Sequence, residues 1–147
     1  MKSLLVTILS FLSALPIIPF SLKLALVRLN YRFKHILPGE REFLFTHYHG
    51  TISVYIKPMY PIEREMATGT YDRVSCEVIA TFVKPDSLVV DVGANAGTLT
   101  LYIAQLLQTG TVVAIEPGPP IFARLRRNID LNPELRKRIV PLHMGVS

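Results

Sequence analysis

The most regular apolar stretch of the chain runs into a turn that is rich in glycine. Leu88–Val90 is an uncharged apolar run, and Val92 resumes it after a single carboxylate at Asp91. Such a run is typical of a strand that is covered on both faces. We therefore expect a buried strand over residues 88–92.

Helix and strand patterns alternate after this strand. Helical spacing predicts a helix over Thr98–Gln108 that ends at Gly110. Its expected inner side consists of Leu99, Ile103, Leu106 and Leu107. Short apolar runs predict strands over Thr111–Ile115 and Ile139–Met144. Strands separated by helices indicate an α/β fold with a parallel, doubly wound, Rossmann-like sheet.

The region before this sheet has a different pattern. Strand-like runs over Arg41–Tyr48 and Thr51–Lys57 flank His49-Gly50, which predicts a β-hairpin within an extension over residues 36–70. A helix should then run from Asp72, as its cap, to Phe82. Its expected inward side comprises Val74, Val78, Ile79 and Phe82, with Cys76 as a small core residue.

The turn after the first sheet strand carries the clearest candidate chemistry. Burying an unpaired charge is costly, so Asp91 indicates a cationic or multi-donor ligand at the end of its strand. Gly93 and Gly97 remove side chains where backbone approaches a ligand or turns sharply. Asn95 between them suits a left-handed conformation or a helix cap.

The spacing of this turn separates two cofactor classes. A dinucleotide fingerprint reads Gly-x-Gly-x-x-Gly, and its middle glycine lets the backbone touch a pyrophosphate. Here the pattern is Asp-x-Gly-x-Asn-x-Gly, with Asn95 in the middle position. S-adenosylmethionine has no pyrophosphate, so this pattern favours it over NAD.

A second carboxylate stands at the tip of the next strand. Glu116 follows Thr111–Ile115 and lies roughly 20 residues past the glycines, where ribose hydroxyls are gripped in such folds. Asp91 and Glu116 should therefore share one edge of a parallel sheet. Either could be a merely structural acid, but the register with Gly93, Asn95 and Gly97 favours a ligand site.

These motifs resemble those of FkbM-type methyltransferases, a branch of the S-adenosylmethionine-dependent class. The matching segments are Asp91-Val-Gly-Ala-Asn-Ala-Gly97, Val113-Ala-Ile-Glu-Pro117 and Leu125-Arg-Arg-Asn-Ile-Asp-Leu-Asn132. The resemblance covers about half of the chain, from Tyr71 onward. It implies that the cofactor-binding residues are Asp91, Gly93, Ala94, Asn95, Gly97, Glu116 and Pro117. The family's usual Tyr-Glu pair is Tyr71-Asp72 here, with a shorter acid.

The resemblance also implies a sheet of about seven strands in the order three-two-one-four-five. The sequence contains the first three of these strands, so we expect residues 71–147 to be the first half of the methyltransferase domain. On this interpretation the fragment alone is inactive, and residues 36–147 alone are aggregated or molten. No catalytic base and no metal ligands are assigned.

Charge is concentrated at the N-terminus. Residues 1–35 hold five basic residues and no acid, whereas the remainder has 11 basic and 11 acidic residues out of totals of 16 and 11. Ser3–Leu22 is uncharged and about long enough to span a membrane. We expect an uncleaved membrane anchor with the domain on the cytoplasmic side, since most basic residues follow the span. An in-plane helix, a cleaved signal peptide and a buried helix are alternatives.

Other polar clusters have simpler interpretations. His47 and His49 alternate on one strand without further ligands nearby, so a solvated hairpin is favoured over a metal site. His143 is expected to be packed rather than catalytic. A basic surface around one helix and its following loop should be solvated, and it comprises Arg124, Arg126, Arg127, Arg136, Lys137 and Arg138.

The function that the sequence predicts is membrane-associated methyl transfer from S-adenosylmethionine to an oxygen or nitrogen atom. The expected acceptor is a small molecule, a glycan or a lipid, and not a nucleic acid, because residues 36–147 carry no net charge. A Rossmann-type nucleotide-dependent oxidoreductase is one alternative. A catalytically inactive, membrane-tethered fragment is another.

Overall fold

The fold was analysed in a computed structural model that describes residues 42–57, 60–67 and 71–146. In chain order the described elements are β1 (Phe43–Tyr48), β2 (Ile52–Ile56), α3 (Pro61–Ala67), α4 (Arg73–Phe82), β3 (Leu88–Val92), α5 (Thr98–Leu106), β4 (Thr111–Ile115), α6 (Pro119–Asp130), α7 (Pro133–Arg136) and β5 (Ile139–Leu142). They fall into two compact units. The first lies within residues 42–51 and 55–73, and the second comprises 52–54 and 74–146.

The strands β1 and β2 form a two-stranded sheet at the positions that the sequence predicts. His49 and Gly50 make the turn, with φ of 46° and 99°. A positive φ at both central residues is what a tight two-residue hairpin requires. In the first unit Phe45, Tyr48, Ile56 and Met66 are buried.

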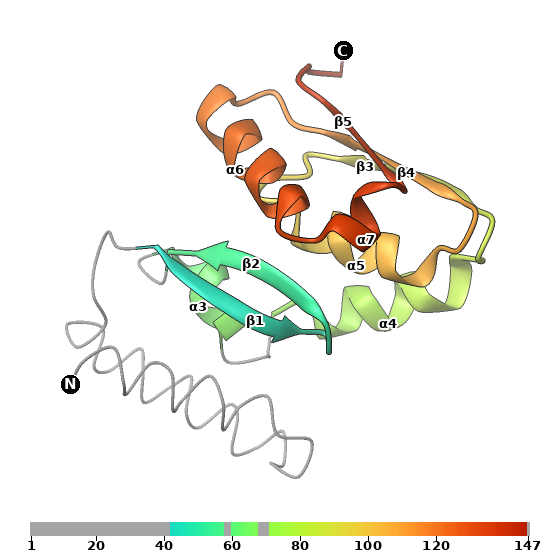
Figure 1. Cartoon of the computed structure of the whole chain (residues 1–147), viewed down its shortest axis with the longest axis horizontal. Coiled ribbons are helices and arrows are strands. Elements are labelled where there is room, and N and C mark those ends of the chain that lie inside the picture. The colour runs from blue at the N-terminus through green and yellow to red at the C-terminus, as the bar shows by residue number, and fades with distance from the viewer. Residues whose placement is uncertain (1–41, 58–59, 68–70, 147) are drawn as a thin grey trace, which may run out of the picture. The chain divides into compact units, whose positions relative to one another are not determined.

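The second unit is built on a parallel sheet in the order β3-β4-β5. Asp91 lies beside Ala114, and Ala114 lies beside Pro141. The two crossovers, from β3 through α5 to β4 and from β4 through α6 to β5, run in the same direction. The helices α5 and α6 therefore cover the same face of the sheet. Figure 1 shows them together on one side. The order matches the three-two-one half of the predicted sheet.

Only one face of this sheet is covered within the described residues. The exposed fractions of Leu88, Val90 and Val92 are 73%, 55% and 61%, whereas Val112 and Ala114 are fully buried. The prediction that β3 is buried on both faces is therefore wrong for the described residues. The alternation along β3 directs Leu88, Val90 and Val92 away from α5 and α6.

The helix α4 begins and ends close to its predicted bounds but presents another side to the protein. Val74 and Phe82 are 73% and 77% exposed, Val78 is also exposed, and Cys76 is the buried residue of this helix. The predicted inward side is wrong, while the prediction of a buried Cys76 is confirmed. Asp72 has a φ of 56°, which differs from the extended backbone of a capping residue.

The expected inner side of α5 is confirmed in part, because Ile103 and Leu107 are both buried. Thr100, Leu101, Ile103 and Ala104 are buried in it, and Leu99 and Leu106 are half-buried. Gly110 is needed for a close approach, because a Cβ there would lie 2.3 Å from the Ser87 carbonyl oxygen. Gly110 lies four residues beyond the end of α5, so its role is close packing against the start of β3.

No helix among the described residues is long and apolar enough to cross a membrane. This finding overturns the predicted membrane-associated localisation. The expected anchor at Ser3–Leu22 lies outside the described residues.

Candidate cofactor site

The turn after β3 is built from backbone conformations that few residues adopt. Gly93, Asn95 and Gly97 have φ of 78°, 51° and 88°. The Asn95 side-chain oxygen accepts a hydrogen bond from the Ala96 N–H at 2.7 Å. Glycine and asparagine are the residues that tolerate this left-handed region best, so the sequence pattern follows from the backbone path. The left-handed conformation predicted for Asn95 is confirmed.

The two glycines face different surroundings. A Cβ at Gly97 would lie 2.5 Å from Cδ1 of the buried Leu125, so Gly97 allows α6 to pack against the turn. A Cβ at Gly93 would meet nothing within 4 Å. Gly93 therefore borders open space at the end of β3, where a ligand could approach the backbone.

Asp91 presents a partly buried carboxylate at the end of β3. Its Oδ2 accepts a hydrogen bond from the hydroxyl of Thr100, at 2.5 Å. Burial raises the pKa of Asp91 above its ordinary value, and the Thr100 hydrogen bond opposes that rise. Within the part of the chain that the structure describes, its second oxygen has no hydrogen-bond partner. That oxygen is therefore suited to a donor on a ligand.

Glu116 lies directly after β4, is only 7% exposed and is held by backbone groups. Its Oε2 accepts from the Asn95 N–H at 3.0 Å, and its Oε1 accepts from the Gly118 N–H at 2.8 Å. The carboxylate thus bridges the turn after β3 and the start of α6. Each oxygen has a second lone pair with which it can accept a further donor.

The two acids lie at the same edge of the sheet. Asp91 is beside Ala114, and Glu116 follows Ala114 by two residues, so both acids belong to the face that α5 and α6 cover. Two carboxylates at one edge of a sheet can accept hydrogen bonds from cationic or hydroxyl groups of a ligand.

Two further residues complete the site, and the sequence reasoning missed both. Thr100 is fully buried and orients Asp91. Asn128 is 1% exposed, and its side-chain amide donates to the Ala96 carbonyl at 2.8 Å. Thr100 interrupts an apolar helix, and a polar residue at such a position indicates a buried partner.

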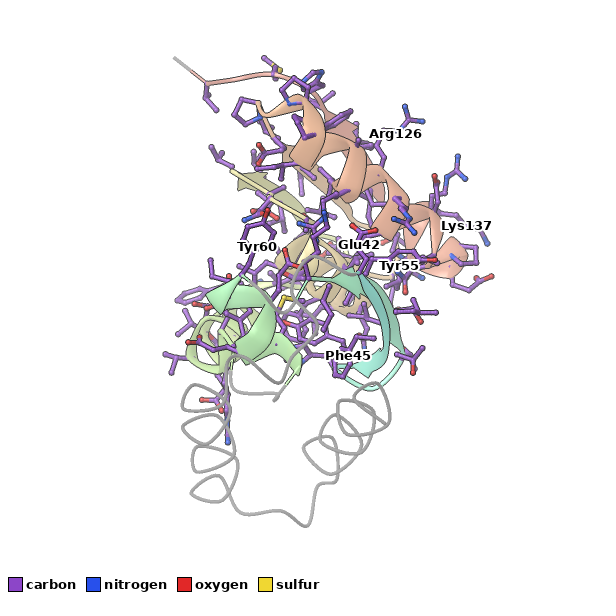
Figure 2. The ribbon with its side chains drawn as sticks, turned by 90° about the vertical axis from the view of Figure 1, so that its left-hand side faces the viewer. Glu42, Phe45, Tyr55, Tyr60, Arg126 and Lys137 are labelled. Carbon is purple, nitrogen blue, oxygen red and sulfur yellow. The ribbon has the colours of Figure 1, made fainter. Side chains whose placement is uncertain are left out.

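Some of the basic residues around α6 and α7 pair with neighbouring groups, and others are exposed. Arg136 pairs with Asp130 at 3.2 Å, and the Arg138 guanidinium donates to the Gln108 carbonyl at 3.2 Å. Arg126 and Lys137 are exposed and point away from the ribbon in Figure 2. The described residues contain no cluster of three or more His, Cys, Asp or Glu side chains that could hold a metal ion.

Comparisons with known proteins agree on one class. Methyltransferase 1 of Beauveria bassiana is 35% identical over 80 residues, which are 54% of this chain and 32% of that protein. The structure of P. horikoshii TYW2 in complex with MeSAdo has a TM-score of 0.53 and 26% identity, over 75% of this chain and 38% of that one. M. jannaschii TYW2 in complex with AdoMet shares the fold, with a TM-score of 0.52, 21% identity and coverage of 73% and 45%. The chain thus spans a third to a half of the length of these relatives.

The fold and the site place the chain in the class of S-adenosylmethionine-dependent methyltransferases. A family model for the TRM5/TYW2 methyltransferase domain matches residues 72–147, more than half of the chain. The chain belongs to this TRM5/TYW2 methyltransferase domain family. The predicted class and its cofactor are confirmed, whereas the comparisons do not support the FkbM-type branch in particular.

Proposed function

We propose that residues 71–147 supply the cofactor-binding half of an enzyme that transfers a methyl group from S-adenosylmethionine to an oxygen or nitrogen nucleophile. The observation that carries this proposal is the placement of Asp91 and Glu116 at the same ends of two adjacent parallel strands, next to the Gly93–Gly97 turn. The relatives solved with AdoMet and MeSAdo support the same ligand class.

Each residue of the site has a distinct task in this proposal. Asp91 pairs with the ammonium group of the cofactor's amino acid through its open oxygen, while Thr100 holds the other oxygen. Glu116 accepts hydrogen bonds from the ribose hydroxyls, and Gly93 leaves room for the ligand. These residues bind and orient the cofactor, and they hold no proton that the reaction moves.

The bound cofactor supplies a methyl carbon on a sulfonium, which is a good leaving group. The protein therefore contributes mainly position and exclusion of water. Among acceptors, the zero net charge of residues 36–147 favours a small molecule, a glycan or a lipid over a nucleic acid, whose binding draws on clustered Lys and Arg.

Calorimetry on the full-length protein with S-adenosylhomocysteine tests the proposal. We expect Glu116→Ala to weaken binding by about 1–3 kcal/mol, because charge-assisted hydrogen bonds to the ribose are lost. Glu134→Ala is the matched control, since Glu134 is an exposed acid on α7 that pairs only with Lys137 at 3.5 Å among the described residues.

Two results would contradict the proposal. Tighter binding of NAD than of S-adenosylhomocysteine would favour the alternative that the protein is a nucleotide-dependent oxidoreductase. An unchanged affinity in Glu116→Ala would remove Glu116 from the ligand site.

A further inference from the structure

The peptide group between Pro117 and Gly118 is held on both of its sides. Its N–H donates to Oε1 of Glu116 at 2.8 Å. Its carbonyl oxygen, on Pro117, lies 3.2 Å from Nε2 of His143. A planar peptide has its N–H and C=O on opposite sides, so a partner on the oxygen also fixes the direction of the N–H.

The imidazole of His143 is itself fixed from a second direction. Its ring stacks on Phe122, with centroids 4.7 Å apart and planes inclined by 16°. Phe122 lies in the first turn of α6, and its N–H bonds to the Gly118 carbonyl at 2.8 Å. His143 follows β5 directly, so the ring connects the tip of β5 to the start of α6.

We propose that His143 is a positioning residue for the cofactor: through the Pro117–Gly118 peptide it holds Glu116 in the orientation that receives ribose hydroxyls. This inference rests on the proposed function and adds to it a residue that the motifs do not mark. The side chain of His143 is exposed, so its contacts with the Pro117 carbonyl and Phe122 lie at the surface and not in the core. The neutral Nε2–H tautomer or the imidazolium supplies the required donor.

The proposal predicts a selective effect on ribose recognition. His143→Phe keeps a ring against Phe122 and removes the donor to the Pro117 carbonyl. We expect the full-length variant to bind S-adenosylhomocysteine about fivefold or more weakly, the effect of one lost hydrogen bond. Binding of the analogue that lacks the ribose 2′ and 3′ hydroxyls should stay within about twofold, because Glu116 then has nothing to orient.

Two further variants separate positioning from a general loss of structure. His143→Gln restores a donor near the place of Nε2 and should recover affinity for S-adenosylhomocysteine relative to His143→Phe. In a double-mutant cycle with Glu116→Ala, His143→Phe should have no further effect on binding. Thermal melts of all variants show whether each one is folded.

The possible failures point to different conclusions. A full-length wild type that binds neither ligand overturns the proposed function and this inference together. If the wild type binds S-adenosylhomocysteine, two results overturn the positioning role alone. In one, His143→Phe has the wild-type affinity. In the other, it loses affinity equally for S-adenosylhomocysteine and for the analogue without ribose hydroxyls. Additive effects of His143→Phe and Glu116→Ala would do the same.

Discussion

Two properties of Asp91 disfavour its ionised form in the folded protein. It is partly buried, which raises its pKa, and one of its oxygens meets no donor among the described residues. An ionised group in such a place destabilises the fold at neutral pH. Because the pKa in the folded state is above the unfolded value of 3.8, this penalty is absent below that value and develops as pH rises through the folded pKa. A carboxylate kept there at a cost in stability indicates a functional role.

We expect Asp91→Asn to separate stability from binding. Asparagine still accepts from Thr100 but carries no charge, so the midpoint of thermal unfolding at pH 7 should be unchanged or higher. Affinity for S-adenosylhomocysteine should fall about tenfold or more, because an ion pair to the ammonium is lost. Wild-type affinity should also weaken as pH falls through the raised pKa of Asp91, and the variant should lack that dependence.

Asp86→Asn is the matched control, because Asp86 is exposed in the turn before β3. Equal affinity of wild type and Asp91→Asn at pH 7 would show that the open oxygen does not meet the cofactor.

At the scale of elements, one buried amide joins α6 to the glycine turn. Asn128 is 1% exposed and donates to the Ala96 carbonyl at 2.8 Å, while Gly97 packs against Leu125 of the same helix. The helix therefore supports the turn through a hydrogen bond and a close contact. The sequence places Asn128 within the matching segment Leu125–Asn132 but does not show its role, because its partner is a backbone oxygen 32 residues away.

Asn128→Ala should lower the free energy of unfolding by about 1–3 kcal/mol, because it leaves the Ala96 carbonyl buried without its donor. Chemical denaturation of the full-length protein measures the effect. Arg126→Ala on the same helix is the control, since Arg126 is exposed. A change no larger than that of the control would show that the hydrogen bond contributes little.

Strand and helix positions in the second unit could be predicted from the sequence, whereas burial could be predicted only in part. The runs at Leu88–Val92 and Thr111–Ile115 are strands with the predicted bounds. The periodicity of apolar residues shows which side of a helix or strand is apolar, but it does not show which neighbouring element covers that side. Val74 and Phe82 therefore have the spacing of a buried helix side, although both are exposed in the structure. The same limit applies to Thr100 and Asn128, whose partners depend on tertiary contacts.

At the scale of the whole molecule, the described residues include several large apolar side chains that are exposed. Leu88, Val90 and Val92 are exposed on one face of β3, and β3 is an edge of the described sheet. Unpaired strand edges beside apolar surface promote association between chains. This surface supports the expectation that residues 36–147 are aggregated or molten when they are expressed alone.

We expect the purified 147-residue chain to elute as oligomers or aggregates in size-exclusion chromatography with light scattering. Val90→Lys should raise the monomer fraction severalfold, because a charge on the bare face of β3 opposes association. Thr109→Lys adds the same charge at an exposed turn and should have little effect. A wild-type chain that is monomeric at high concentration would refute the role assigned to this face.

Glutamate and glutamine are not interchangeable at position 116, because the Glu116 carboxylate accepts two backbone hydrogen bonds. Both carboxylate oxygens receive a backbone N–H, one from Asn95 and one from Gly118. Glutamine offers a single acceptor, so its amino group would face one of these donors without a bond. The loop after β3 and the start of α6 therefore need a carboxylate between them even before a ligand arrives. Selection for a well-ordered loop would retain this acid in a relative that had lost its enzymatic activity.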